Sequence, residues 1–512
     1  MVSIFQWLIL SLCVPDIFAQ TQGWNLLFGT TVPEEVVKKP LTFDNPVPKW
    51  IKGSLIRNGP GRFEMGPHSF LNVFDGYAKL YSWQFPGNGS VYFSAKFVQS
   101  MFYNESLKIK DIARYQTFDD LVPPMSQLNK EEAFIRGLDN MNVNIYNYTG
   151  ECVLLTDVWK LYVVDCHTLK TIRSCDPPIP GDHTTFPYIS GMSVAHPVPE
   201  VGTDYHLTIR QSLAILPGMS DKFTLVRVKS ADIREKVAEW EVKKMPYQHS
   251  ILSTERYALI FATPLYMDTK ALLQSFVARQ SLIFNKDEQT TVYVVEIKTG
   301  QVHTIQTETV FSMHYLNAYE IDNNTIVMDV ASYPDGSVVA FFEMDNLMNK
   351  TRRDSAPYKP SLKRYKIDIL GKKIKPMSFG VNPKVPHVNM MDMPTINERY
   401  RSKPYCYAYG VVFKSDFKTF GNFSIVKKDV CSSFGDLSWN VADQYPMESW
   451  FVPDPNGSRE DDGVLLTPML DGKLGKSYLV ILDPKTMKPI SKAQLPILVP
   501  FHFHGRFIDN VY

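Results

Sequence analysis

The chain of 512 residues has a formal net charge of +1 at pH 7, because 54 lysines and arginines balance 53 acidic residues. Such a balance, without a long run of one charge, is not typical of proteins that bind nucleic acids or strongly acidic partners. Hydrophobic residues make up 44% of the chain, enough for a sizeable core. The aromatic content of 13% and the 35 prolines favour strands and loops over helices.

The first segment resembles a targeting sequence. Residues 4–14 form an apolar run that is too short to span a bilayer but fits the apolar region of a signal peptide, and Ala19 suits the cleavage site. We expect a signal peptide over residues 1–20, a single domain over residues 21–512 and a secreted, extracellular protein. The alternatives are a signal anchor or a misassigned start, because no Lys or Arg precedes the run and Asp16 lies near the cleavage site.

N-glycosylation acceptors support the same route. An N-x-S/T sequence occurs seven times, whereas chance alone gives roughly three. Several acceptors lie in turn-like surroundings such as FPGNGS and PDPNGS, so we expect a glycoprotein. The acceptors are Asn88, Asn104, Asn147, Asn323, Asn349, Asn422 and Asn456.

The five cysteines that follow the predicted signal peptide allow two interpretations. In the first, Cys166 pairs with Cys175 across a hairpin, Cys406 pairs with Cys431 between neighbouring strands, and Cys152 stays buried and free. In the second, all five are unpaired and mostly buried thiols. No C-x-x-C sequence is present, which argues against a cysteine-based zinc site.

Strands separated by turns fill most of the chain. KLYSWQF, PGNG and SVYFSAKFV over residues 79–98 predict a hairpin. One pattern recurs at residues 161–172, 292–305 and 478–490: an alternating apolar strand, an acidic residue, a turn with Thr and a second strand. Radially repeated four-stranded sheets produce such repeats, so we predict an all-β protein built as one large β-propeller. A set of β-sandwiches is the alternative. Residues 121–137 are expected to form a loop or short helix.

Four of the eleven histidines lie beside strand-like apolar runs: His196, His249, His314 and His504. Their separations match no local metal motif, and each alone is typical of a hydrogen-bonded, half-buried histidine. In a propeller, however, the innermost strands converge, so histidines distant in sequence can meet. Four neutral imidazoles suit a borderline ion such as Fe(II). His502 is expected on the same face of the last strand as His504. Six histidines in polar or turn-like surroundings are expected at the surface: His68, His167, His183, His206, His303 and His387.

Ordered motifs over residues 45–508 resemble the carotenoid cleavage oxygenase family, which includes the animal β-carotene oxygenases and the retinoid isomerase of the retinal pigment epithelium. The motifs include PKWIKGSLIRNGPGRF (48–63), LNVFDGYAKL (71–80), SVAHPVP (193–199), YQHS (247–250), MHYLNAYE (313–320), EDDGVLL (460–466) and FHGRF (503–507). The resemblance implies a seven-bladed β-propeller capped by loops and short helices on the active-site face. It also implies one Fe(II) per chain, held by His196, His249, His314 and His504.

The resemblance further implies three carboxylates that accept hydrogen bonds from ligand histidines. Glu448 matches one of the family's glutamates, whereas Asp157 and Asp392 stand where the family has the other two. Aspartate is one carbon shorter, about 1.5 Å less in reach. We therefore expect a direct hydrogen bond to be lost, bridged by water or restored by a backbone shift, and the site to be tuned rather than inactive. Thr156 matches a family residue that limits access to an open metal position.

The function that the resemblance implies is oxidative cleavage of a conjugated double bond of a carotenoid or apocarotenoid, such as β-carotene, with O2 as co-substrate and aldehydes or ketones such as retinal as products. Two alternatives remain: a retinoid isomerohydrolase, and a secreted carotenoid- or retinoid-binding protein with weak or no catalysis. The lipophilic substrate suggests peripheral contact with a membrane or lipid particle. Residues 121–137 are only modestly apolar, which argues against stable attachment.

Overall fold

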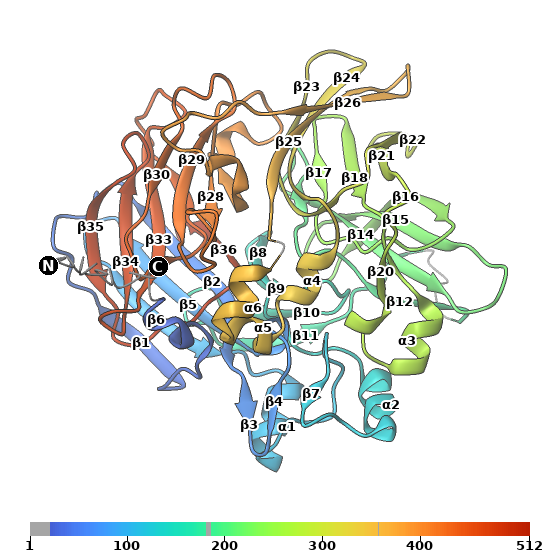
Figure 1. Ribbon diagram of the computed structural model, residues 1–512, viewed down its shortest axis with the longest axis horizontal. Helices are drawn as coiled ribbons and strands as arrows, with labels where there is room; N and C mark the ends of the chain where they lie inside the picture. The colour runs from blue at the N-terminus through green and yellow to red at the C-terminus, as the bar shows by residue number, and fades with distance from the viewer. Residues whose placement is uncertain (1–20, 181–185, 357) are drawn as a thin grey trace, which may run out of the picture.

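Short strands joined by turns account for most of the structure, as the aromatic and proline content predicts (Figure 1). The computed structural model describes residues 21–180, 186–356 and 358–512. The predicted signal peptide and His183 lie outside the described residues. Seven of the sheets formed by the described residues contain four or five strands each, and neighbouring strands within them pair antiparallel. The arrangement of these seven sheets determines where the side chains of the candidate functional site lie.

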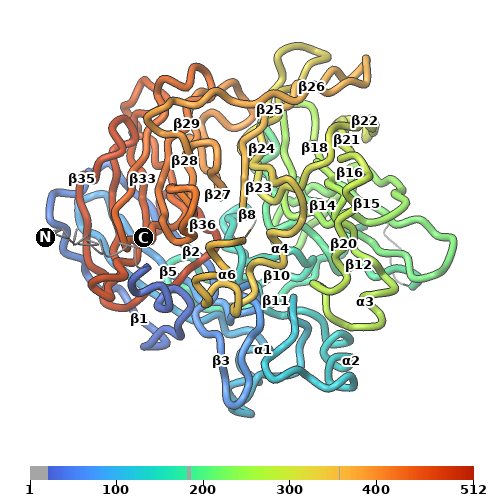
Figure 2. The backbone as a smooth tube through the Cα atoms, in the orientation of Figure 1, coloured from blue at the N-terminus to red at the C-terminus, as the bar shows by residue number. Residues whose placement is uncertain are grey.

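The first sheet joins the beginning of the described chain to its end. The order of its strands is β1 (Glu35–Pro40), β6 (Tyr92–Phe97), β5 (Tyr77–Pro86), β2 (Lys52–Arg62) and β36 (His504–Asp509). β36 pairs with β2 from Gly53 opposite Asp509 to Asn58 opposite His504. A Cβ atom on Gly505 would lie 2.1 Å from the carbonyl oxygen of Ile56, so a glycine permits this close pairing. Figure 2 shows the two strands side by side.

The next three sheets follow in chain order. The second is β11 (Thr171–Cys175), β10 (Leu161–Val164), β9 (Glu151–Leu155) and β8 (Asn144–Tyr148). The third is β12 (Tyr188–Met192), β14 (His206–Ala214), β15 (Asp221–Val228) and β16 (Arg234–Val242), with β13 (Val198–Pro199) also on β14. The fourth is β17 (Leu252–Ser253), β18 (Tyr257–Ala262), β21 (Thr290–Glu296) and β22 (Val302–Thr307).

Three further sheets complete this series. The fifth is β23 (Phe311–Glu320), β24 (Thr325–Tyr333), β25 (Ser361–Asp368) and β26 (Lys373–Ser378). The sixth is β27 (Asp392–Ile396), β28 (Tyr407–Val412), β29 (Ser424–Asp429) and β30 (Leu437–Trp439). The seventh is β31 (Gln444–Pro446), β33 (Gly463–Asp471), β34 (Lys476–Asp483) and β35 (Lys488–Gln494), with β32 (Trp450–Pro453) also on β33.

At six of the seven junctions between neighbouring sheets, an edge strand of one sheet contacts an edge strand of the next. The contacts run from β36 to β8, from β13 through β17, β23 and β27 to β32, and from β32 back to β36. Between β8 and the segment before β13, the Asn144 side chain donates to the carbonyl oxygen of Ala195 at 3.0 Å. These links form a closed ring of inner edge strands, which directs side chains from all seven sheets toward a common centre.

The three predicted repeats are hairpins made of the two outermost strands of their sheets: β10–β11, β21–β22 and β34–β35. Each turn uses the same hydrogen bond, in which a threonine hydroxyl donates to the acidic side chain three residues earlier. Thr168 donates to Asp165 at 2.9 Å, Thr486 donates to Asp483 at 2.8 Å, and Thr299 donates to Glu296. The predicted hairpin at residues 79–98 is also confirmed, as β5 and β6.

Short helices and two small sheets lie outside the seven larger sheets, and Figure 1 shows most of them on one side of the molecule. The helices are α1 (Met101–Ile109), α2 (Gln127–Arg136), α3 (Thr269–Ser275), α4 (Ser337–Phe341), α5 (Met344–Met348) and α6 (Lys350–Ser355). The small sheets are β3 (Glu64–Met65), β4 (His68–Phe70) and β7 (Leu121–Val122), and β19 (Leu265–Met267) with β20 (Leu282–Phe284). The expected loop or short helix at residues 121–137 is thus β7 followed by α2. Among the described residues, no helix combines the length and apolarity that a membrane crossing requires.

One of the two predicted disulfides is wrong. Cys406 pairs with Cys431 as predicted, but Cys166 pairs with Cys152, and Cys175 is the free thiol. Cys175 lies opposite Leu161, at the end of the β10–β11 hairpin that is remote from the turn containing Cys166. Cys152 instead lies on β9 and pairs with Val164 of β10. Val164 stands two residues before Cys166 in the chain. Strand register therefore decides the pairing.

Candidate metal centre

The structure brings together the four histidines that the sequence singled out. His196, His249, His314 and His504 each present a ring nitrogen, and these four atoms all lie within 4.8 Å of one another. The Nε2 atoms of His314 and His504 are 3.1 Å apart. The Nε2 atoms of His196 and His249 are buried and have no hydrogen-bond partner among the described residues. The four rings therefore converge through nitrogens that are free of other protein partners.

Each of the seven larger sheets contributes one side chain to this centre. His504 begins β36, His314 lies within β23, and Asp392 begins β27. The remaining four lie in short segments beside strands of their sheets: Asp157 after β9, His196 before β13, His249 before β17, and Glu448 between β31 and β32. A centre built in this way requires the whole ring of sheets to be in place.

The three predicted carboxylates each contact one of the histidines. Nδ1 of His249 lies 2.8 and 2.9 Å from the two carboxylate oxygens of Asp157. Nδ1 of His314 lies 2.8 Å from Asp392, and Nδ1 of His504 lies 2.8 Å from Glu448. The two aspartates thus reach their histidines directly, and neither the loss of the bond nor a water bridge, both considered from the sequence, is observed. A backbone irregularity accompanies the contact at Asp392, because the β27–β28 register shifts after this residue and Met393 has a φ of 50°.

These contacts determine which nitrogen of each ring points inward. Each carboxylate accepts a hydrogen bond from Nδ1–H, so the proton of the neutral ring stays on Nδ1 and the lone pair of Nε2 is available to a metal ion. His196 differs, because its Nδ1 lies 3.4 Å from the side-chain amide nitrogen of Asn144. The residues present therefore fit a metal ion: four buried nitrogens converge, and three of their rings are held by carboxylates.

Burial shapes the charge of this group. Burial, reinforced by the neighbouring histidines, lowers the pKa of His196 and of His504 well below its usual range, so both rings are neutral near pH 7. For His314, burial favours the neutral ring, but the charge and hydrogen bond of Asp392, together with the charges of Glu448 and Asp157, outweigh burial and raise the pKa. Burial also raises the pKa of Glu448, against the opposing charge of Arg57. A divalent cation would supply positive charge close to Asp157 and Asp392, which have no arginine partner of the kind that Glu448 has among the described residues.

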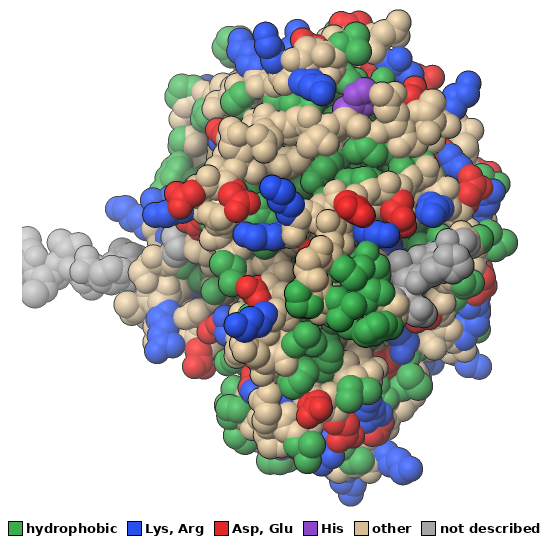
Figure 3. Space-filling model, turned by 90° about the vertical axis from the view of Figure 1, so that its right-hand side faces the viewer, with side chains coloured by type: hydrophobic (Ala, Val, Ile, Leu, Met, Phe, Trp, Pro, Cys, Tyr) green, Lys and Arg blue, Asp and Glu red, His purple; other side chains and the backbone are tan. Residues whose placement is uncertain are grey.

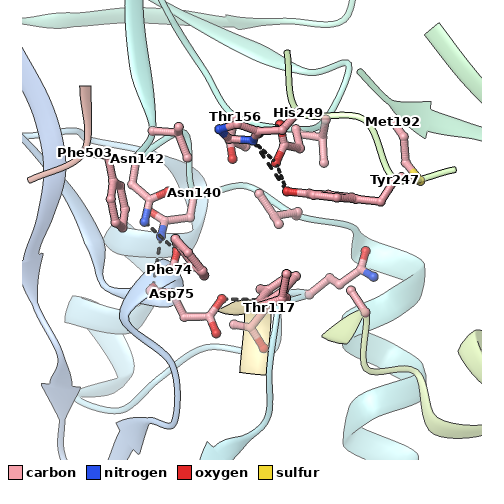
Figure 4. Close-up of a pocket in the computed structure, with 18 of the residues that line it drawn as sticks. Phe74, Asp75, Thr117, Asn140, Asn142, Thr156, Met192, Tyr247, His249 and Phe503 are labelled. Carbon is pink, nitrogen blue, oxygen red and sulfur yellow. Dashed lines mark hydrogen bonds and ion pairs between the residues drawn. The ribbon is translucent and has the colours of Figure 1, made fainter. Parts of the chain in front are cut away.

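A cavity of about 630 Å³ opens beside the four histidines, three of which line it: His249, His314 and His504. Thr156 and Asp157 also line it, next to His249 (Figure 4). Figure 4 shows Phe74 and Phe503 on one side of the cavity and Tyr247 and Met192 on the other. The volume falls in the range of small-molecule sites.

The two ends of the cavity differ in polarity. Its deeply buried end has aromatic and aliphatic side chains, including Val339, Met393, Phe413, Phe501 and Phe503. Its more exposed end includes Gln116, Arg136, Lys160, Asp176 and Gly191. Arg136 and Lys160 are already paired, with Glu105 and Asp139 respectively. The amide of Gln116 has no hydrogen-bond partner among the described residues.

The exposed end of the cavity is flanked by apolar side chains of α2 and α3. Phe134 and Leu272 line the cavity, and the rings of Phe134 and Phe276 are 5.3 Å apart. Also on α2, the side chains of Leu128 and Ile135 are 74% and 78% exposed. Figure 3 shows apolar side chains gathered on this face of the molecule. Leu128 and Ile135 thus give α2 an exposed apolar surface.

Two histidines lie in surroundings that the sequence did not predict. His502 precedes β36 rather than belonging to it, is fully buried, and neither joins the four-histidine group nor lines the cavity. Its Nδ1 lies 3.1 Å from the carbonyl oxygen of Pro500. His206, expected at the surface, packs against the rings of Tyr146 and Tyr148, and burial lowers its pKa to about 3. His206 thus packs within its sheet at the start of β14, and His502 packs in the segment before β36.

Sequence reasoning did not single out the groups that hold the carboxylates. The Tyr247 hydroxyl donates to Asp157 at 2.6 Å, and the Tyr333 hydroxyl donates to Asp392. The guanidinium group of Arg57 contacts Glu448 and donates to the carbonyl oxygen of Phe503 at 2.8 Å. Tyr247 lies in the YQHS motif and Arg57 lies in the RNGPG motif. Membership of these motifs was the only indication in the sequence that the two residues contribute to the site.

Comparison with known proteins agrees with this geometry. The family described as retinal pigment epithelial membrane protein matches residues 29–509. A rat β,β-carotene 15,15'-dioxygenase is 25% identical over 95% of this chain and 92% of its own length. The carotenoid cleavage dioxygenase 8 of Arabidopsis thaliana is 26% identical over 94% of this chain and 85% of its own length.

Solved structures resemble the chain over nearly its full length. A variant of Synechocystis apocarotenoid oxygenase has a TM-score of 0.77 at 22% identity, and the cobalt-substituted Synechocystis enzyme has a TM-score of 0.78 at 23% identity. Each comparison covers 96% of this chain and 99% of the other. At these identities the structural similarity shows that the fold is shared. The match to the family model shows that the chain is a member of the family. The chain belongs to the retinal pigment epithelial membrane protein family, the family of the carotenoid cleavage oxygenases.

Proposed function

We propose that the protein is a non-haem Fe(II) dioxygenase that cleaves a conjugated double bond of a carotenoid or apocarotenoid with O2, giving aldehyde or ketone products. One observation carries the proposal. Four histidines converge through free nitrogens beside an apolar cavity. The chain is also similar along its length to proteins named as carotenoid-cleaving dioxygenases.

Iron is the ion we assign to this centre. His196, His249, His314 and His504 would hold it through Nε2, and neutral imidazoles suit a borderline ion better than hard cations such as Mg²⁺ or Ca²⁺. Asp157, Asp392 and Glu448 would orient three of these rings and fix their tautomers. When bound, Fe(II) supplies the activation of dioxygen. The chain itself excludes water and positions the polyene.

The cavity supports a long apolar substrate with one polar end. The aromatic inner end can enclose a hydrocarbon tail or ring, so that one double bond is held near the histidines. Water can reach the outer end, where the unpaired amide of Gln116 can hydrogen-bond to a hydroxyl or carbonyl oxygen. Thr156 lies beside Asp157 and lines the cavity next to His249 (Figure 4), which agrees with a role in shaping the oxygen site.

We also assign the fold in more detail, as a seven-bladed β-propeller formed by residues 21–512 as one domain. Seven sheets of four or five strands support this assignment, as does the ring of contacts among their inner edge strands. The pairing of β36 with β2 would close the first blade with both ends of the chain. The small sheets and short helices would cap the face with the cavity.

The alternatives are less well supported. A binding protein with weak catalysis was favoured by the two aspartates, but both make direct contacts of 2.8 Å with their histidines. A retinoid isomerohydrolase would use the same iron without incorporating oxygen. We propose a secreted, glycosylated protein, because two disulfides suit an oxidising compartment and Asn88, Asn104 and Asn456 are exposed. The apolar surface of α2 supports contact with lipid that carries the substrate.

The test uses protein from a eukaryotic secretory host, loaded with Fe(II) under nitrogen. It is mixed with β-carotene or an apocarotenal under ¹⁸O2, and products are analysed by mass. We expect labelled aldehydes from the wild type and none from His314→Ala. A parallel reaction with a retinyl ester tests the isomerohydrolase: release of isomerised retinol and a fatty acid, without label from O2, would favour that alternative. Bound pigment that stays intact after iron loading would favour the binding protein.

A further inference from the structure

The two aspartates at the candidate metal centre share a feature that Glu448 lacks. Each accepts a hydrogen bond from a tyrosine hydroxyl: Asp157 from Tyr247 at 2.6 Å, and Asp392 from Tyr333. In both cases the tyrosine donates to Oδ2, while Oδ1 accepts a hydrogen bond from a backbone N–H. The backbone donor is Ala195 for Asp157, at 3.0 Å, and Met393 for Asp392, at 2.8 Å. The carboxylates are therefore held at both oxygens.

Proton counting fixes the direction of the bond at Tyr333. Its hydroxyl lies near both Asp392 and the Tyr358 hydroxyl, the latter at 3.3 Å. A hydroxyl has a single proton, and the contact with Asp392 is the shorter one. Tyr333 therefore donates to Asp392 and accepts from Tyr358. The result is an ordered chain from Tyr358 through Tyr333 and Asp392 to His314.

Glu448 is held by other means. Its second oxygen faces the buried guanidinium group of Arg57, which also donates to the backbone carbonyl of Phe503, the residue before His504. A charged, forked donor ties this longer carboxylate to the strand of its histidine. Within the described part of the chain, no lysine or arginine forms an ion pair with either aspartate. Asp157 is also 21% exposed at its side chain and lines the cavity, where water competes for its oxygens.

We propose that Tyr247 and Tyr333 are positioning residues that hold Asp157 and Asp392 against His249 and His314, and so set the affinity of the four-histidine site for a divalent transition metal ion. The inference rests on the proposed metal site. A free aspartate rotates about its χ2 angle and spreads its hydrogen bond over several ring orientations. Donation from the tyrosine to the second oxygen selects the orientation in which Nε2 points at the centre.

The test measures binding of Co²⁺ alone, without substrate or turnover, by its visible absorption bands and by competition with a chelator. Tyr247→Phe and Tyr333→Phe remove one hydroxyl each and keep the rings that line the cavity. The control is Tyr315→Phe, which removes a buried hydroxyl one residue from His314. That hydroxyl accepts from Gln248 at 2.7 Å and donates to the carbonyl oxygen of Phe261 at 3.2 Å, away from the carboxylates.

We expect each of the two variants to bind Co²⁺ about tenfold more weakly, the lower bound for losing an outer partner of a metal ligand. Their cobalt bands should also shift, because ring orientation changes the ligand field. Tyr315→Phe should stay within about twofold of the wild type. Metal-free unfolding midpoints establish which variants are folded. If one tyrosine variant does not fold, the other carries the test.

Two results would overturn the inference while leaving the proposed metal site in place. Affinities and spectra of both variants within about twofold of the wild type would show that the hydroxyls do not position the ligands. An equal loss in Tyr315→Phe would show that any buried hydroxyl near β23 matters. A wild type that binds no Co²⁺ would remove the proposed metal site together with this inference, which distinguishes that failure from the first two.

Discussion

The buried pair of Arg57 and Glu448 connects the stability of the fold to the candidate metal centre. Arg57 is fully buried on β2, and its guanidinium group is the cationic partner of Glu448. Replacing it in Arg57→Met leaves the carboxylate buried without a cation. Breaking such a pair at one side costs about 3–5 kcal/mol of unfolding free energy. We expect a loss of this size in the metal-free protein.

The loss should depend on pH in a defined direction. Burial raises the pKa of Glu448 above its usual value of 4.5, and the charge of Arg57 limits this rise. Without Arg57 the folded-state pKa rises further. A carboxyl group with a higher pKa in the folded state binds more protons there than in the unfolded state. The unfolding free energy of Arg57→Met should therefore fall, relative to the wild type, as the pH rises above 4.5 toward the folded-state pKa.

The assay is guanidinium unfolding of the metal-free protein at about pH 5 and about pH 8, because the loss of stability in the variant should grow as the pH rises above the usual pKa of a glutamate. The double variant Arg57→Met/Glu448→Gln is the matched control, because it removes the charge that Arg57→Met exposes. We expect the double variant to be more stable than Arg57→Met at the higher pH and to lack the added pH dependence. Equal stability of the two variants at both pH values would refute the reasoning.

Four other predictions concern separate parts of the molecule. Mass mapping without reduction should find Cys152 linked to Cys166, with Cys175 alkylated as a free thiol; a Cys166–Cys175 peptide would contradict the register of β9 and β10. Burial lowers the pKa of Lys79 to about 7, so wild-type stability should rise with pH between about 7 and the unfolded value of 10.5, by at most about 5 kcal/mol. The unfolding free energy of Lys79→Met, measured by denaturant titration, should not rise with pH in this range. A rise equal to that of the wild type would contradict the prediction. Gln116→Leu should weaken the binding of a hydroxylated polyene by about tenfold, which corresponds to the loss of one hydrogen bond of about 1.4 kcal/mol. The affinity for the parent hydrocarbon should not change. An equal loss of affinity for both ligands would refute the assignment of a polar end to the cavity. Leu128→Glu with Ile135→Glu on α2 should reduce flotation with liposomes, and unchanged flotation would remove the lipid contact.

The sequence was informative where a local pattern has a single structural meaning. The hairpin at residues 79–98 and the repeated acid–turn–threonine hairpins depend only on neighbouring residues, and both formed as predicted. The four histidines were identified because each lies in a motif beside an apolar run. Their convergence, together with three carboxylates, follows from a ring in which each sheet adds one side chain.

Features that depend on register or on distant partners were not accessible. The pairing of Cys152 with Cys166 depends on how β9 lies against β10, and strand order alone does not reveal this. His502 was assigned to the face of His504 by alternation, but the strand begins only at His504. The reach of Asp392 depends on a backbone irregularity beside it, which no count of side-chain carbons predicts.

The central claim is that four histidines hold one iron ion. The most direct measurement is iron per chain in purified, folded protein after anaerobic addition of Fe(II), with His314→Ala as the matched variant. We predict close to one iron per chain in the wild type and little in His314→Ala. A folded wild-type protein that takes up no iron, or a variant that takes up as much as the wild type, would contradict the account.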